Sequence, residues 1–181
     1  MTLAYPRHAV LTGAPGAGKT TLLGAAAAAG CSTSPEVARH LLQQPGGMAL
    51  READPTGFAE AMLEAHVREF ELAAAQPGPV LFDRGFADVA GFLDVSGLAV
   101  PRSIEQACRR LRYHGPIFRA PAWAAIYRQD HERIQTWEQA VASDAAVTAA
   151  WRRYGYEVID LPLAGVAERL EFLTARLQPA A

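Results

Sequence analysis

Short apolar segments alternate along the chain with longer segments in which apolar residues recur every three or four positions. The short segments have the composition of buried strands, and the longer ones have the spacing of amphipathic helices. The predicted strands cover 7–12, 31–33, 80–83, 116–120 and 156–161. The predicted helices cover 18–29, 34–44, 54–75, 86–95, a segment from 103, 137–154 and 165–177. Because strands and helices alternate, we expect a largely parallel sheet with helices on both faces.

Several predicted helix boundaries carry residues that start or stop helices. Ser34-Pro35 and Asp54-Pro55 are typical helix starts, and the cluster 45–47 of proline and two glycines ends the helix between them. Ser103 and Gln106 have the spacing of a capping box. The core-facing residues of the helix at 137–154 are predicted to be Val141, Val147 and Trp151.

One loop carries a specific phosphate-binding pattern. The sequence Gly13-Ala14-Pro15-Gly16-Ala17-Gly18-Lys19-Thr20 lies between the first predicted strand and the first helix, which is the setting of a P-loop, or Walker A, motif. Its backbone N–H groups and the helix N-terminus favour a bound phosphate. We expect Lys19 to reach the β- and γ-phosphates of ATP, Thr20 to hold Mg²⁺, and Thr21 to contact the α-phosphate.

The alternative is a glycine-rich turn that binds nothing. Against it, Lys19 is the only lysine among the 17 lysines and arginines of the chain. A compact and rotatable ammonium suits phosphate oxygens, so the single use of lysine at this position favours the phosphate site.

Length and composition limit the number of domains and the classes of protein to which this chain can belong. A chain of 181 residues is expected to form a single domain, 1–181. A net charge of −2 gives no basic surface for nucleic acid, and no apolar run is long enough for a membrane span or signal peptide, so a cytoplasmic protein is expected. Cys31 and Cys108 are predicted to be buried thiols. The chain has no asparagine, which disfavours a GTPase because the guanine-reading motif needs one.

An acid followed by an arginine ends the third predicted strand. Asp83 is placed to hold Mg²⁺, directly or through water, as a Walker B aspartate does, and Arg84 is placed to contact a phosphate or the acceptor. The stretch 83–85 resembles the acid-arginine pair that nucleoside- and nucleotide-kinase-like P-loop proteins carry at this place. The alternative is an aspartate that caps a turn.

The segment 121–136 is polar and contains arginines. In kinase-like P-loop folds this segment is the lid, whose arginines neutralise charge as the γ-phosphoryl group moves. Arg119, Arg128 and Arg133 are candidates, and Arg128 and Arg133 are predicted to be catalytic. The alternative is a solvated helix face on which these arginines pair with nearby acids.

Glu36 and Arg39 follow the second predicted strand, where acceptor contacts are often made in this kind of fold. They are candidates for substrate binding. The alternative for Glu36 is a carboxylate that stabilises the first turn of a helix.

Together these segments resemble a bacterial family of AAA-type P-loop domains, predicted ATPases or kinases, that is similar to the kinase domain of the NAD-biosynthesis regulator NadR. The segments that carry the resemblance are 11–20, 35–39, 82–85, 126–130 with 132–133, and 154–162. The resemblance implies a three-layer α/β/α P-loop fold, a five-stranded and mainly parallel sheet of order 2-3-1-4-5, and a mobile helical lid. It does not identify a substrate.

Two functions from different classes stay open. The first is an ATP- and Mg²⁺-dependent phosphotransferase that acts on an unidentified small-molecule, nucleoside or nucleotide acceptor. The second is an ATPase or nucleotide-dependent switch that acts on a protein partner. The lid arginines and the Asp83-Arg84 pair favour the first function, with Lys19, Asp83, Arg84, Arg128 and Arg133 as its predicted catalytic residues. The preference for one nucleotide base over another also stays open, as does the oligomeric state, for which a homodimer is one possibility.

Overall fold

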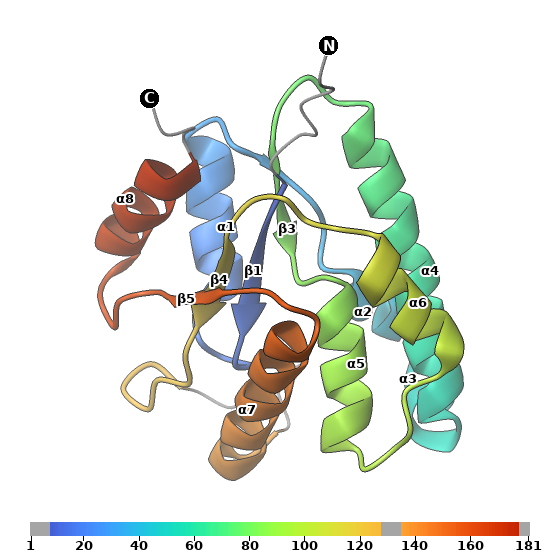
Figure 1. Ribbon diagram of the computed structural model, residues 1–181. Helices are drawn as coiled ribbons and strands as arrows, with labels where there is room; N and C mark the ends of the chain where they lie inside the picture. Colours follow the sequence, from blue (N-terminus) through green and yellow to red (C-terminus); the bar gives the residue numbers. More distant parts are fainter. Residues whose placement is uncertain (1–7, 128–134, 178–181) are drawn as a thin grey trace.

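The computed structural model describes residues 8–127 and 135–177 (Figure 1). Its five strands are β1 (Ala9–Gly13), β2 (Ser32–Thr33), β3 (Val80–Asp83), β4 (Ile117–Ala120) and β5 (Val158–Asp160). They form one sheet of order β2-β3-β1-β4-β5, in which every neighbouring pair is parallel. The predicted strand order 2-3-1-4-5 is therefore confirmed.

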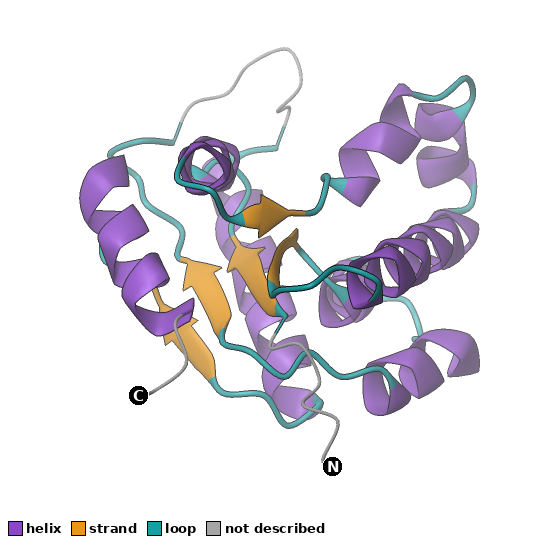
Figure 2. Ribbon diagram, turned by 90° about the horizontal axis from the view of Figure 1, so that it is seen from above, coloured by secondary structure: helices purple, strands orange, loops and turns teal. Residues whose placement is uncertain are grey.

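Helices cover both faces of this sheet, as Figure 2 shows. The helices of the described residues are α1 (Lys19–Ala28), α2 (Val37–Gln43), α3 (Gly47–Ala53), α4 (Pro55–Ala74), α5 (Phe86–Val95), α6 (Arg102–Arg110), α7 (Trp137–Arg153) and α8 (Val166–Leu177). Helices α1 and α8 pack on one face, and α4, α5, α6 and α7 pack on the other. The result is the three-layer α/β/α fold that the sequence resemblance implies.

The central strands are buried on both faces. Val10 lies opposite Phe82 on one side and Ile117 on the other, and these three side chains join the core beneath α4, α5 and α7. The next residue, Leu11, lies opposite Phe118 and joins the core beneath α1 and α8. Because both faces are apolar, these strands appear in the sequence as uninterrupted hydrophobic runs.

Two predicted helix starts were wrong. Helix α2 begins at Val37, and the Ser34 hydroxyl accepts a hydrogen bond from the Asp83 N–H (3.1 Å) instead of capping the helix. Helix α6 begins at Arg102, and the Ser103 hydroxyl donates to a Glu60 carboxylate oxygen (3.4 Å), so the predicted capping box does not form. Both hydroxyls bond to residues far away in the sequence, which a local pattern cannot show.

The sequence also gave no indication of α3. The predicted break exists, with Gly46 at a φ of 81°, but the helix resumes immediately at Gly47. A Cβ added to Gly47 would lie 2.0 Å from the Leu41 carbonyl oxygen, so glycine permits the close approach of α2 and α3. Met48 and Leu50 are exposed, which leaves α3 without the apolar stripe of a buried helix.

The core face of α7 also differs from its prediction. Val147 and Trp151 are buried as expected, but Val141 is 41% exposed and was wrongly placed in the core. Ala140 and Asp144 are buried in its place. Asp144 bonds to Arg119 of β4, a tertiary contact that a local pattern of apolar residues cannot show.

The carboxyl ends of β1 and β3 lie side by side near the centre of the sheet, with Leu11 opposite Asp83. In open parallel sheets, ligands bind at this edge. The topology therefore brings the loop after β1 next to Asp83 and Arg84, which the sequence separates widely. Within the described ranges, no helix has both the length and the apolar content needed to cross a membrane.

Candidate functional site

The loop 13–20 is anchored against β4 at its start and leads directly into α1 at its end. Gly13 has a φ of 120°, and an added Cβ would lie 2.1 Å from the Ala120 carbonyl oxygen, so only glycine fits beside β4. The Ala14 N–H donates to the same oxygen (3.0 Å). Gly18, with a φ of 80°, leads directly into α1, whose N-terminus has no side-chain cap. The first-turn N–H groups of α1 have no acceptor within the helix and adjoin a cavity, which suits a phosphate.

A buried arginine of α8 anchors this loop through hydrogen bonds. The Arg169 guanidinium donates to the Ala17 carbonyl (2.7 Å) and to the Pro162 carbonyl (2.9 Å), and it lies 5.0 Å from the centroid of the Trp123 ring. Arg169 is only 2% exposed. It ties α8 to the phosphate-binding loop, and the sequence pattern of α8 gave no signal of this role.

The Lys19 ammonium lies inside the curve of the loop. It donates to the Ala14 carbonyl (2.6 Å) and lies 3.4 Å from the Gly13 carbonyl oxygen. Burial and, to a lesser extent, the nearby Arg84 charge lower the pKa of Lys19 to about 7, and the Asp83 carboxylate opposes this shift. An anion at the loop would favour the charged ammonium and raise this pKa again.

Asp83 ends β3 beside the loop. Its carboxylate is buried, and within the described part of the chain Oδ1 has no hydrogen-bond partner. Burial, with smaller contributions from the Glu36 and Asp88 charges, raises the pKa of Asp83 to about 6 against the opposing effect of the Arg84 and Lys19 charges. A buried carboxylate oxygen without a donor is costly, and a bound cation would compensate for it. The turn-capping alternative has no corresponding hydrogen bond among the described residues.

Arg84 is fixed in place by Asp88 on the first turn of α5. Arg84 has a φ of 65°, a conformation that side chains rarely adopt and that often marks functional sites. Its guanidinium donates to an Asp88 carboxylate oxygen (3.0 Å). The same carboxylate accepts hydrogen bonds from the Thr12 hydroxyl (2.5 Å), the Gly85 N–H (3.0 Å) and the Trp151 indole N–H (3.0 Å).

Asp88 was missed by the sequence reasoning. Two local signals were available: its spacing of four residues from Arg84 and its place in the first turn of a helix. Neither signal distinguishes a buried carboxylate with several donors from an ordinary surface pair, because the Thr12 and Trp151 contacts come from distant elements.

Glu36 and Arg39 line the same cavity as the phosphate-binding loop. The Arg39 Nε lies 3.3 Å from a Glu36 carboxylate oxygen, and both side chains stay partly exposed. A smaller cavity of about 240 Å³ next to the main one is also lined by Glu36, Arg39, Thr20 and Asp83. The structure therefore brings the predicted acceptor-binding and metal-binding residues together.

The lid prediction has a mixed outcome. Arg128 and Arg133 lie outside the described residues. Arg119 was wrongly assigned to the lid: it lies within β4 and forms ion pairs with Asp144 (2.8 Å) and Asp160 (3.0 Å), which tie β4 to α7 and β5.

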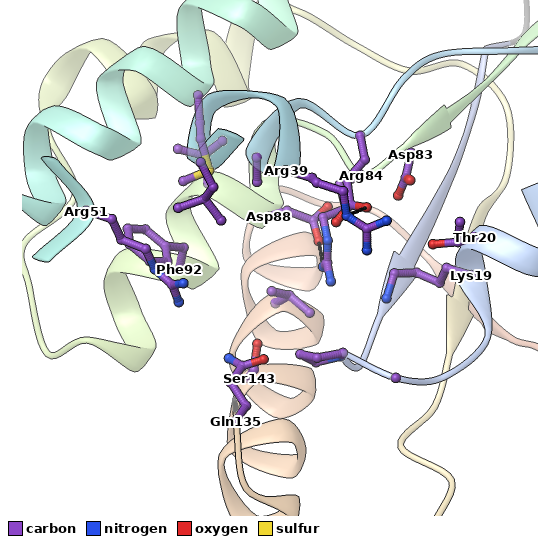
Figure 3. Close-up of a pocket in the computed structure, with 18 of the residues that line it drawn as sticks. Lys19, Thr20, Arg39, Arg51, Asp83, Arg84, Asp88, Phe92, Gln135 and Ser143 are labelled. Atoms are coloured by element: carbon purple, nitrogen blue, oxygen red, sulfur yellow. Dashed lines mark hydrogen bonds and ion pairs between the residues drawn. The ribbon is translucent and has the colours of Figure 1, made fainter. Parts of the chain in front are cut away.

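The main cavity has a volume of about 770 Å³ and extends well beyond the phosphate-binding loop. We call its far part the distal chamber. The distal chamber takes its walls from α2, α3, α4, α5 and α7, and its main lining residues are Leu42, Met48, Arg51, Phe58, Met62, His66, Val89, Phe92, Ser143 and Val147. Figure 3 shows Lys19, Thr20 and Asp83 at one side of the cavity, and Arg51 and Phe92 at the opposite side.

The distal chamber is mostly apolar with a few polar groups. His66 is buried in its wall, and burial lowers the pKa of this imidazole to about 4, so it is neutral near pH 7. Its ring meets Phe86 edge-on at 6.3 Å between centroids. A neutral imidazole and the Ser143 hydroxyl can exchange hydrogen bonds with an uncharged part of a small molecule.

Comparisons with solved structures agree with this fold. Deoxyadenosine kinase from M. mycoides with dCMP and dCDP has a TM-score of 0.67 at 14% identity, over 94% of this chain and 98% of that one. NadR in complex with NR has a TM-score of 0.64 at 14% identity, over 96% of this chain and 51% of that one. The present chain thus spans about half of NadR. At this identity the likeness concerns the fold.

A search among functionally curated proteins finds no significant match. The model of the AAA domain family matches residues 8–169, which includes the phosphate-binding loop, β3 and all five strands. This chain therefore belongs to the AAA domain family, as a P-loop NTPase with a nucleoside-kinase-like fold.

Proposed function

We propose that this protein is an ATP- and Mg²⁺-dependent phosphotransferase, which phosphorylates a hydroxyl group of a small, nucleoside-like acceptor bound in the distal chamber. The observation that carries the proposal is the shape of the main cavity. It joins the phosphate-binding loop to a mostly apolar chamber, with Asp83 and Glu36 near the loop. ATP hydrolysis alone needs no such chamber, whereas a kinase must hold an acceptor next to the γ-phosphate.

The loop and α1 supply the donor site. The N–H groups of Gly16 to Thr20 and the Lys19 ammonium would bind the β- and γ-phosphates, and Thr21 would contact the α-phosphate. The anchoring of this loop by Arg169 and Ala120 supports the assignment, because preorganised donors lose little freedom when the anion binds.

Thr20 and Asp83 are the residues that would hold Mg²⁺. The buried Asp83 oxygen without a hydrogen-bond donor fits this role. In the described ranges, no group of three or more histidines, cysteines and acids could hold a metal by itself. Mg²⁺ commonly takes only one or two protein ligands and completes its shell with phosphate and water, so a two-residue site is sufficient. When bound, the ion would supply neutralisation of phosphate charge.

Glu36 is the residue that we assign as general base. The acceptor hydroxyl oxygen forms a bond to the γ-phosphorus, its proton passes to the Glu36 carboxylate, and the bond between the γ-phosphorus and the β–γ bridging oxygen breaks to release ADP. The Arg39 side chain orients Glu36, and Arg84, held by Asp88, faces the transferred charge. Arg128 and Arg133 are proposed to add positive charge from the lid.

The deciding experiment incubates the pure protein with Mg²⁺-ATP and a panel of nucleosides and other small alcohols. A kinase produces ADP slowly without an acceptor and faster when its acceptor is present. Mass spectrometry then shows an acceptor that is heavier by one phosphoryl group. Glu36→Gln should lower kcat about 10²-fold and change the KM for ATP little. Brisk ATP hydrolysis that no acceptor stimulates and no phosphorylated product accompanies would favour the ATPase or switch.

A further inference from the structure

The two ends of the cavity carry different charge. Around the phosphate-binding loop and the end of β3, the cavity is lined by three cations and three anions: Lys19, Arg39, Arg84, Glu36, Asp83 and Asp88. In the distal chamber, the one formally charged side chain among the described lining residues is Arg51, on α3. The chamber therefore carries a net positive charge at the end remote from the loop.

Arg51 has no acidic partner among the described residues. Within residues 8–127 and 135–177, no carboxylate forms an ion pair with its guanidinium. The neighbouring Glu52 is exposed and does not line the cavity. The Arg51 guanidinium carbon instead lies 6.0 Å from the centroid of the Phe92 ring (Figure 3). This contact holds the cation against an apolar wall and leaves its hydrogen-bond donors for another group.

The wall around Arg51 suits a flat ring. Phe58 and Phe92 meet at 5.8 Å between centroids with their planes at 63°, and Met62 lines the chamber beside them. Aromatic and thioether side chains contact planar rings favourably. An anionic group on such a ring could accept charge-assisted hydrogen bonds from the Arg51 guanidinium, which are stronger than hydrogen bonds between neutral groups.

We propose that the distal chamber binds a planar ring that carries an anionic group, and that Arg51 pairs with this group. The inference rests on the proposed function, in which the ring belongs to the end of the acceptor remote from the phosphorylated hydroxyl. Arg51 is then a specificity-determining residue that distinguishes anionic acceptors from their neutral analogues.

The test compares carboxylates with their isosteric carboxamides. The probes are benzoate and benzamide, 2-naphthoate and 2-naphthamide, and 5-carboxyuridine and 5-carboxamidouridine, with affinities measured by calorimetry. The wild type should bind at least one carboxylate about tenfold more tightly than its carboxamide. Arg51→Met, which keeps an unbranched side chain without the charge, should remove this preference. Arg68→Met, at an exposed arginine outside the cavity, should keep it.

The proposal is overturned if the wild type binds both members of every pair with equal affinity, or if the preference for carboxylates survives in Arg51→Met. Arg51 would then only pack against Phe92. The kinase proposal is tested by separate measurements, namely ATP binding and the formation of a phosphorylated product. A kinase that phosphorylates neutral acceptors without any preference for carboxylates refutes only the Arg51 subsite. Carboxylate binding that depends on Arg51, without any phosphorylated product, refutes only the kinase.

Discussion

The two ends of the main cavity are built in different ways. The phosphate end uses one continuous stretch, 13–21, together with Asp83 and Arg84 from the adjacent strand. In the proposed function many of its phosphate-binding groups are backbone N–H groups, and buried partners such as Asp88 and Arg169 hold its shape. The distal chamber is instead assembled from single side chains of five helices.

If the proposed function holds, this difference makes phosphate binding and acceptor choice largely separate properties of the molecule. A loop built from backbone groups keeps its function when wall residues change. A chamber built from side chains can change its ligand through one or two substitutions. The predictions below test this separation, from the largest expected effect to the smallest.

Asp83→Asn should lower kcat by about 10²–10³-fold, because the carboxylate would no longer hold Mg²⁺ at the phosphates. Steady-state kinetics with Mg²⁺-ATP measure this effect. The melting temperature at pH 7.5 should not fall. Since the pKa of Asp83 is raised to about 6, the folded state loses stability as pH rises toward 6, and asparagine removes that cost. A strongly destabilised variant that keeps its activity per folded molecule would support the turn-capping role.

Lys19→Ala should weaken ATP binding by about 1.5–3 kcal/mol, or about 10- to 150-fold, because a charge-assisted hydrogen bond to phosphate is lost. Calorimetric titration with ATP measures the change. Acceptor binding in the distal chamber should stay within twofold of the wild type. Unchanged ATP affinity in a folded variant would refute the phosphate-binding role.

Arg128→Ala and Arg133→Ala should each lower kcat by about tenfold or more, with a much smaller change in the KM for ATP. The physical reason is that a lid arginine meets charge that develops only in the transition state. Arg110→Ala, at an exposed residue of α6, is the matched control. If both lid variants keep wild-type kcat, these arginines belong to a solvated surface.

Ser143→Trp should raise the KM for the acceptor by about tenfold, because the indole would occupy part of the distal chamber. The dissociation constant for ATP should not change. Ala142→Trp places the same side chain on the exposed side of α7 and should leave both constants unaltered. Equal weakening of ATP and acceptor binding by Ser143→Trp would show that the two ends are not independent.

ATP affinity should fall several-fold between pH 7.5 and 9. The pKa of Lys19 is lowered to about 7 by burial, so Lys19 of the free protein is already mostly neutral at pH 7.5 and almost wholly neutral at pH 9. Bound phosphate must restore the proton, and this costs more as the pH rises. Titrations in buffers of different ionisation enthalpy should show proton uptake on binding. The pH dependence should be absent from Lys19→Ala. A wild-type affinity that stays constant over this range would contradict the shifted pKa.

The sequence by itself determined the phosphate end and the sheet. The pattern 13–20 specifies a phosphate loop because its function depends on backbone geometry, and glycine spacing encodes that geometry locally. The central strands β1, β3 and β4 could be recognised because they are largely buried and contain few polar residues. Asp83 and Arg84 could be placed near the loop because parallel strands end at the same edge of the sheet.

Only the tertiary structure decided the distal chamber and the supports of the site. Asp88 takes its donors from β1, from the end of β3 and from α7, and Arg169 reaches the loop from α8. Helix α3, which carries Arg51, has no apolar stripe from which the sequence could predict a helix. A local pattern reports how a segment folds and which face it buries. The identity of the side chains that meet across a cavity depends on how distant helices pack, and that information is present only in the folded chain.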